Sequence, residues 1–176
     1  MSHGPRTGSL KHSLLRAEGG AVGGLIGAVV VALLFFFEGA LHLHQPLAVP
    51  SALTSAWFGG VDGSSGAASG LGADVITLFR FLVYTLVHLL TFAAVGASAA
   101  LVLAGSRFWE SVGAGAIYGG AVCTLLLYLV GRLADTPVAL DVLGLRRVLL
   151  ANMLAGAFIG IALYVAEHGD DGNVTG

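Results

Sequence analysis

Four long apolar segments, at about residues 19–43, 75–104, 111–131 and 147–166, constrain this chain more than any other feature. Each is close to the ~20 residues that a helix needs to cross the hydrocarbon core of a bilayer. Inside hydrocarbon every peptide group must be hydrogen-bonded, and these continuous runs differ from the ~10-residue alternating strands of a membrane barrel. The sequence therefore predicts an all-α polytopic membrane protein, a bundle of four transmembrane helices.

The composition supports the same class of protein. Of the 176 residues, 56% are hydrophobic and only 10% are charged, whereas soluble domains carry roughly 25% charged residues. With 8 Lys and Arg against 10 Asp and Glu, the chain has no broad basic surface, which argues against a nucleic-acid partner. The lipid bilayer is the partner that the composition implies. The single cysteine, Cys123, cannot form an intrachain disulfide, and we interpret it as a packing residue.

The flanking segments divide the chain further. Residues 1–18 form a basic N-terminal arm, which either lies on the lipid headgroups or is a frayed tail. Residues 19–166 are predicted to be the transmembrane domain, interrupted by a flexible Gly/Ser loop at 59–74. Residues 167–176 form a polar C-terminal tail.

The basic residues beside the first apolar segment predict its orientation. Arg6, Lys11 and Arg16 precede this segment, and the loop after it has no basic residue before Arg80. By the positive-inside rule both termini are predicted to be cytoplasmic, in a cell inner (cytoplasmic) membrane. Counted over the ends of all four segments, the basic residues balance, so this prediction depends on the first segment alone.

Glycines are concentrated inside the apolar segments, and the chain has 27 of them. Small residues four apart let helix backbones approach closely in lipid, where burial of apolar surface does not drive association. Two interpretations remain open: packing within the chain, or contact with a membrane-protein partner or a second copy. The glycines predicted to pack helices are Gly23, Gly27, Gly96, Gly115, Gly119, Gly156 and Gly160.

Polar residues recur every four positions within the apolar segments. Arg80, Tyr84 and His88 share one helical face. Ionisable groups in a membrane almost always face the interior of the bundle or water. We therefore predict an intramembrane polar cluster that comprises Glu38, Arg80, Tyr84, His88, Tyr128, Arg132 and Asn152. At ~1.5 Å rise per residue Glu38 lies at the level of Arg80 and Arg132, so either arginine is its expected ion-pair partner.

Histidines raise the question of a cofactor. His88 lies near the middle of the bilayer and is a neutral imidazole bonded to a neighbouring helix, a haem or metal ligand, or a proton relay. A bis-histidine haem would need a second histidine from a partner subunit or a second copy. Glu38, His42 and His44 have the chemistry of a copper or zinc site. We expect no cofactor, and keep haem, copper and zinc as alternatives.

A short motif carries a resemblance. The run Tyr84-Thr85-x-x-His88-x-x-x-Phe92-x-x-x-Gly96, preceded by Pro46-Leu47-x-x-Pro50 and followed by Asn152, resembles a family of uncharacterised bacterial four-helix integral membrane proteins. The resemblance implies a shared bundle with His88, Tyr84, Glu38 and Asn152 at its polar centre, and no known activity. That family places the Pro-Leu step sooner after its acidic residue, whereas GALHLHQ separates Glu38 from Pro46 here.

Function is predicted only as a class. The chain has no HExxH, GxSxG or Walker motif and no paired nucleophile and base, so we expect that it is not an enzyme. We expect an accessory or scaffold subunit of a larger membrane complex. The alternative is a small transporter or an ion or proton pathway along Glu38, Arg80 and His88. Transporters of known type usually contain internal repeats, and we find no convincing repeat.

Overall fold

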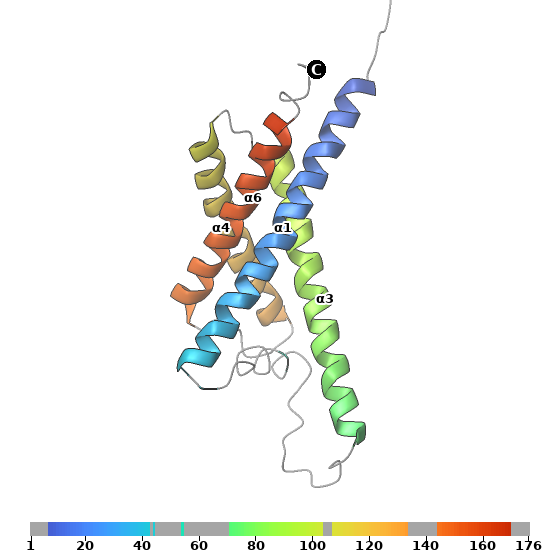
Figure 1. Ribbon diagram of the computed structural model, residues 1–176, viewed down its shortest axis with the longest axis vertical. Coiled ribbons are helices and arrows are strands. Elements are labelled where there is room, and N and C mark those ends of the chain that lie inside the picture. Colours follow the sequence, from blue (N-terminus) through green and yellow to red (C-terminus); the bar gives the residue numbers. More distant parts are fainter. Residues whose placement is uncertain are drawn as a thin grey trace, which may run out of the picture.

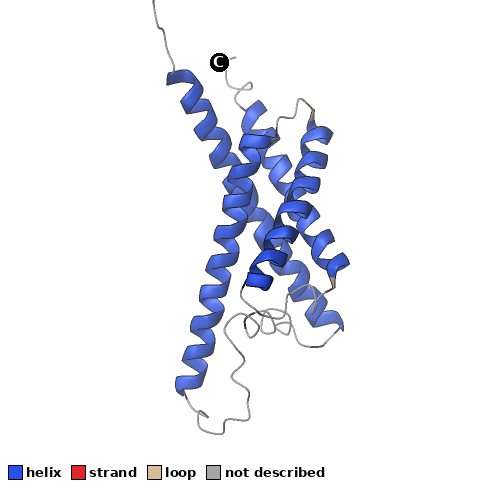
Figure 2. Ribbon diagram, turned by 180° about the vertical axis from the view of Figure 1, so that it is seen from behind, coloured by secondary structure: helices blue, strands red, loops and turns tan. Residues whose placement is uncertain are grey.

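The computed structural model describes residues 7–42, 44, 54, 71–103, 107–133 and 144–169. These residues form four α-helices and no strand (Figures 1 and 2). The helices are α1 (Thr7–His42), α3 (Leu71–Val102), α4 (Phe108–Leu133) and α6 (Leu145–His168). Each helix contains a segment long and apolar enough to cross a membrane. The prediction of an all-helical bundle with four transmembrane helices is therefore confirmed.

Helix α1 differs most from its predicted bounds. It begins at Thr7 rather than near residue 19, so most of the predicted N-terminal arm continues the first helix. Its 36 residues correspond to about 54 Å at ~1.5 Å per residue, more than the ~30 Å hydrocarbon core. No proline interrupts residues 7–18, which explains why the helix continues through the arm.

The other helix ends lie within a few residues of the predictions. Helix α3 begins at Leu71, so the last part of the predicted Gly/Ser loop is helical, and the remainder of that loop lies outside the described residues. Helix α6 extends through Glu167 and His168, which were assigned to the polar tail.

The four helices are arranged in the order α3, α1, α6, α4. Helix α1 packs against both α3 and α6, and α6 packs against α1 and α4, whereas α3 contacts α4 and α6 only marginally. Neighbours in this order run antiparallel, and the first described turn of α1 lies at the same end as the last turn of α6 (Figure 1). We call this end the N-terminal end of the bundle. Figure 1 shows α1 and α3 crossing and then diverging toward the opposite end.

Backbones meet directly where α1 crosses α3. A Cβ atom on Gly20 would overlap the carbonyl of Gly96, and one on Gly24 would overlap the carbonyl of Phe92. Only glycine fits such an approach, which brings the helix axes close enough for extensive dispersion contact in a solvent that supplies no hydrophobic drive.

The other two helix pairs also meet at small residues. Gly23 and Gly27 of α1 lie against Ala155, Ile159 and Ala162 of α6. Between α4 and α6, the glycines in contact are Gly115, Gly119, Gly156 and Gly160, the last of which lies on the backbone of Ser111.

The interior consists of small and branched apolar side chains. Ala28, Ala99, Ala155 and Ile159 are essentially inaccessible to solvent. Large leucine, valine and phenylalanine side chains are exposed along every helix, as expected of a surface that faces acyl chains. This distribution is the reverse of that in a soluble bundle, where the largest apolar side chains are inside.

Candidate functional site

His88 of α3 contacts α1 at the level of Ala28. Its Nε2 lies 3.4 Å from the Ala28 carbonyl oxygen, which accepts the hydrogen bond when Nε2 carries the proton. The imidazole lies between two aromatic rings of the same helix. The Tyr84 ring is nearly parallel to it at 6.1 Å and the Phe92 ring is tilted at 4.8 Å, between ring centroids. His88 is therefore held by aromatic packing and by one long hydrogen bond.

Asn152 of α6 forms an interhelical hydrogen bond with α4. Its Nδ2 donates to Thr124 Oγ1 at 3.1 Å, and the Asn152 side chain is buried. Gly119 and Gly156 bring the two backbones together one helical turn away. The close approach at glycine thus places two short polar side chains within bonding distance.

A third polar contact joins α3 to α4, which otherwise meet only marginally. The hydroxyl oxygens of Ser98 and Tyr118 are 2.9 Å apart, and Ser98 Oγ also donates to the Val95 carbonyl at 2.8 Å. Because Ser98 donates to the backbone, the Tyr118 hydroxyl is the donor to Ser98. The sequence analysis did not include this pair, although a serine and a tyrosine in neighbouring apolar segments are candidates for such a bond.

The ion-pair partner of Glu38 differs from the prediction. Glu38 Oε1 lies 2.7 Å from a terminal guanidinium nitrogen of Arg147 in α6, whereas Arg80 or Arg132 was expected. The prediction was based on the depth of each residue along its helix and did not establish that α1 packs against α6. Arg147 stands in the first turn of α6, beside the last turn of α1.

Tyr128 and Arg132 interact within α4 rather than with the other predicted polar residues. Arg132 Nε donates to the Tyr128 hydroxyl at 3.3 Å, and its guanidinium carbon is 5.4 Å from the ring centroid. Both residues are exposed. Among the described residues, the predicted cluster is thus distributed over separate contacts: His88 with α1, Asn152 with α4, Glu38 with α6, and Tyr128 with Arg132.

An ion pair at the N-terminal end of the bundle was not predicted from the sequence. A terminal nitrogen of Arg16 lies 2.7 Å from Glu167 Oε1, and the same nitrogen donates to the Leu103 carbonyl at 2.6 Å. Both charged side chains are largely shielded from solvent. Arg16 was assigned to the N-terminal arm and Glu167 to the tail, so neither was considered as an interhelical contact. The sequence did contain a signal for this contact: the residues before Gly19 are compatible with a helix that continues without interruption into the first apolar segment.

The two ion pairs between α1 and α6 lie at opposite ends of the helix pair. Arg16 and Glu38 are separated by about 33 Å along α1, and Arg147 and Glu167 by about 30 Å along α6, at ~1.5 Å per residue. These lengths are close to the ~30 Å hydrocarbon thickness of a bilayer. The spacing of the charges along the antiparallel pair is therefore compatible with positions near the two membrane interfaces.

The predicted metal site remains a prediction. The described residues contain no group of three or more His, Cys, Asp or Glu side chains that could hold a metal ion. The side chain of His42 lies outside the described part of the structure, and His44 is exposed. The grouping of Glu38, His42 and His44 is therefore untested.

Comparisons with known protein families, with curated proteins and with solved structures find no match to this chain.

Proposed function

We propose that this multi-pass membrane protein is a non-catalytic accessory or scaffold subunit of a larger membrane complex. We further propose that it resides in a cell inner (cytoplasmic) membrane with both termini in the cytoplasm. The three basic residues before the first membrane segment support this orientation.

The contacts that its interior polar groups make between helices support a structural role. His88, Asn152, Glu38 and Arg16 each contact the backbone or a side chain of a different helix. Such bonds fix the rotation and register of neighbouring helices, and hydrogen bonds between membrane helices contribute about 0.6 kcal/mol on average, with a maximum of about 1.7 kcal/mol. A helix bundle bonded in this way is a suitable rigid platform for a partner.

The position of α3 is the observation that carries the proposal. This helix packs closely against α1 alone among the described helices. Its opposite face presents a ladder of leucines four residues apart, each more than half exposed: Leu78, Leu82, Leu86 and Leu90. The glycine pairs are already occupied by contacts within the chain. We therefore assign partner contact to the leucine face of α3 rather than to the glycines.

The alternative, a small transporter or an ion or proton pathway, has less support. The Glu38 carboxylate is engaged by Arg147, and the His88 ring is directed toward the Ala28 carbonyl. The two side chains therefore contact different helices. A flux assay of the purified protein in liposomes, with proton and alkali-cation gradients, tests this alternative: gradient-dependent flux lost in Glu38→Gln would favour it.

The scaffold proposal can be tested by photo-crosslinking in native membranes. A photoreactive residue at Leu82 or Leu86 is expected to capture one partner, or a second copy, in amounts stoichiometric with the chain. The control positions are Leu33 on α1 and Leu125 on α4, which are comparably exposed. Capture of lipid alone at all four positions, from a chain that purifies alone in mild detergent, would contradict the proposal.

A further inference from the structure

Arg16 stands where three helices come together at the N-terminal end of the bundle. One terminal nitrogen of its guanidinium binds the Leu103 carbonyl, just after the end of α3, and the Glu167 carboxylate, in the last turn of α6. The last carbonyls of a helix have no partner within it and carry partial negative charge. A guanidinium between the carboxyl-terminal ends of α3 and α6 therefore satisfies one such carbonyl and complements both helix dipoles.

On the α4–α6 side, the other support of the end of α3 is partial packing of Leu103 against the apolar core. Helix α3 contacts α4 and α6 only marginally. Its backbone contact with α1 is centred on Gly96, about 10 Å before Leu103 at ~1.5 Å per residue. The Ser98–Tyr118 bond is also nearer the middle of the helix. Among the described polar contacts, those of Arg16 thus join Leu103, the last residue of this segment, to α6.

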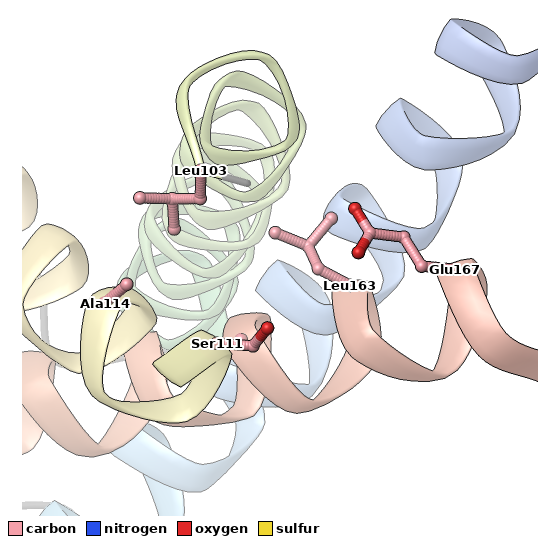
Figure 3. Close-up of a pocket in the computed structure, with 6 residues that line it drawn as sticks. Leu103, Ser111, Ala114, Leu163 and Glu167 are labelled. Carbon is pink, nitrogen blue, oxygen red and sulfur yellow. The ribbon is translucent and has the colours of Figure 1, made fainter. Parts of the chain in front are cut away.

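A small hollow lies beside this contact. Leu103, Ser111, Ala114, Gly160, Leu163 and Glu167 line it, and Figure 3 shows Leu163 directed toward the end of α3 and Leu103 directed to the side of Ala114. It has room for about a single water molecule. The end of α3 therefore faces incompletely filled space on this side. Leu103 is packed only in part against the apolar core beside this hollow, whereas at Gly96 the backbones of α1 and α3 touch.

We propose that Arg16 is a latch that holds the end of α3 against the α1–α6 pair. Loss of its two contacts releases the end of α3, which swings away from α6 about the Gly20–Gly96 crossing and opens the hollow beside Ser111 to the membrane surface. The crossing is the pivot because backbone contact at glycine is retained there. In this motion α3 moves as a rigid unit relative to the α1–α6 pair, as in other hinge motions.

Spin labels at exposed positions on α3 and α6 test the latch. Cysteines replace Leu101 and Val165, which are 75% and 58% exposed, in a chain whose buried Cys123 is changed to serine. The label-to-label distance is measured by pulsed electron paramagnetic resonance in lipid nanodiscs. Arg16→Leu is expected to lengthen the mean distance by about 5 Å, on the order of one helical turn.

The matched control is Arg147→Leu. It breaks the ion pair with Glu38, which joins the same two helices over the same 2.7 Å, at the opposite end. It is expected to leave the label distance unchanged. If Arg16→Leu fails to fold, as judged by circular dichroism and gel filtration, Arg16→Gln removes the charge while retaining a polar side chain. An unchanged distance in the folded Arg16 variant, or equal lengthening in Arg147→Leu, would overturn the latch.

Discussion

At the scale of single residues, the polar side chains predicted to form one cluster make separate contacts along the bundle. Arg80, Tyr84 and His88 were predicted to face inward because they share a helical face. Tyr84 and His88 do lie against each other, and His88 reaches α1. The partners could not be predicted, because a four-residue repeat gives the face of one helix but not the identity or depth of the helix opposite.

The bond between Asn152 and Thr124 should couple α4 to α6 energetically. We expect Asn152→Ala and Thr124→Val each to lower the free energy of unfolding. The double variant should lose less stability than the sum of the two single losses. The coupling energy should be about 1 kcal/mol, within the range for hydrogen bonds between membrane helices. Unfolding in mixed micelles measures all four proteins. Strictly additive losses would show that the 3.1 Å contact does not contribute to stability.

His88 should tolerate replacement by phenylalanine. The hydrogen bond to Ala28 is long at 3.4 Å, and an aromatic ring would preserve the packing with Phe92. We expect His88→Phe to lower the free energy of unfolding by less than about 1 kcal/mol. An absorption spectrum and metal analysis of the purified wild-type protein address the ligand alternative. Stoichiometric haem or metal that is lost in His88→Phe would establish the histidine as a ligand instead.

At the scale of helices, glycine doublets give α1 two packing faces. Gly23 and Gly27 lie against α6, whereas Gly20 and Gly24 lie against α3. The sequence analysis selected the first pair and missed the second. Adjacent residues in a helix point about 100° apart, so Gly19-Gly20 and Gly23-Gly24 together indicate a helix packed on two sides. Those doublets were the available signal that α1 is central.

The contacts of each glycine predict which substitutions are tolerated. In Gly156→Ala the new methyl group would overlap the Gly115 carbonyl and the Gly119 backbone, so α4 and α6 must separate. We expect a loss of about 1 to 3 kcal/mol, the usual cost of overpacking. Gly113→Ala is the matched control on α4, since its methyl group meets nothing within 4 Å. Equal stability of the two variants would mean that α4 and α6 do not pack through Gly156.

At the scale of the whole molecule, hydropathy predicted the fold class and the approximate bounds of the membrane segments, because both follow from bilayer thickness. The order of helices around the bundle did not follow, since lipid-facing and partner-facing apolar residues are chemically alike. The charged pairs depend on that order. Once α1 is placed beside an antiparallel α6, Glu38 meets Arg147 and Arg16 meets Glu167. Glu38 then lies near the amino-terminal end of α6 and Arg16 near its carboxyl-terminal end, where the helix dipole favours each charge.

These two ion pairs should differ in their contribution to stability, although they join the same helices at the same distance. Arg147 is 65% exposed and Glu38 23%, whereas Arg16 and Glu167 are 25% and 18% exposed. Water and headgroups screen the exposed guanidinium of Arg147, so Glu38→Gln should cost no more than about 1 kcal/mol. Glu167→Gln weakens a shielded charged hydrogen bond beside two helix ends and should cost roughly 1.5 to 3 kcal/mol. Unfolding of both variants in the same bicelles provides the comparison. A higher salt concentration should reduce the difference in the free energy of unfolding between wild type and Glu38→Gln, but not the loss of stability in Glu167→Gln. A larger loss in Glu38→Gln would mean that the opposite end, rather than the Arg16 end, is where the bundle is most firmly held.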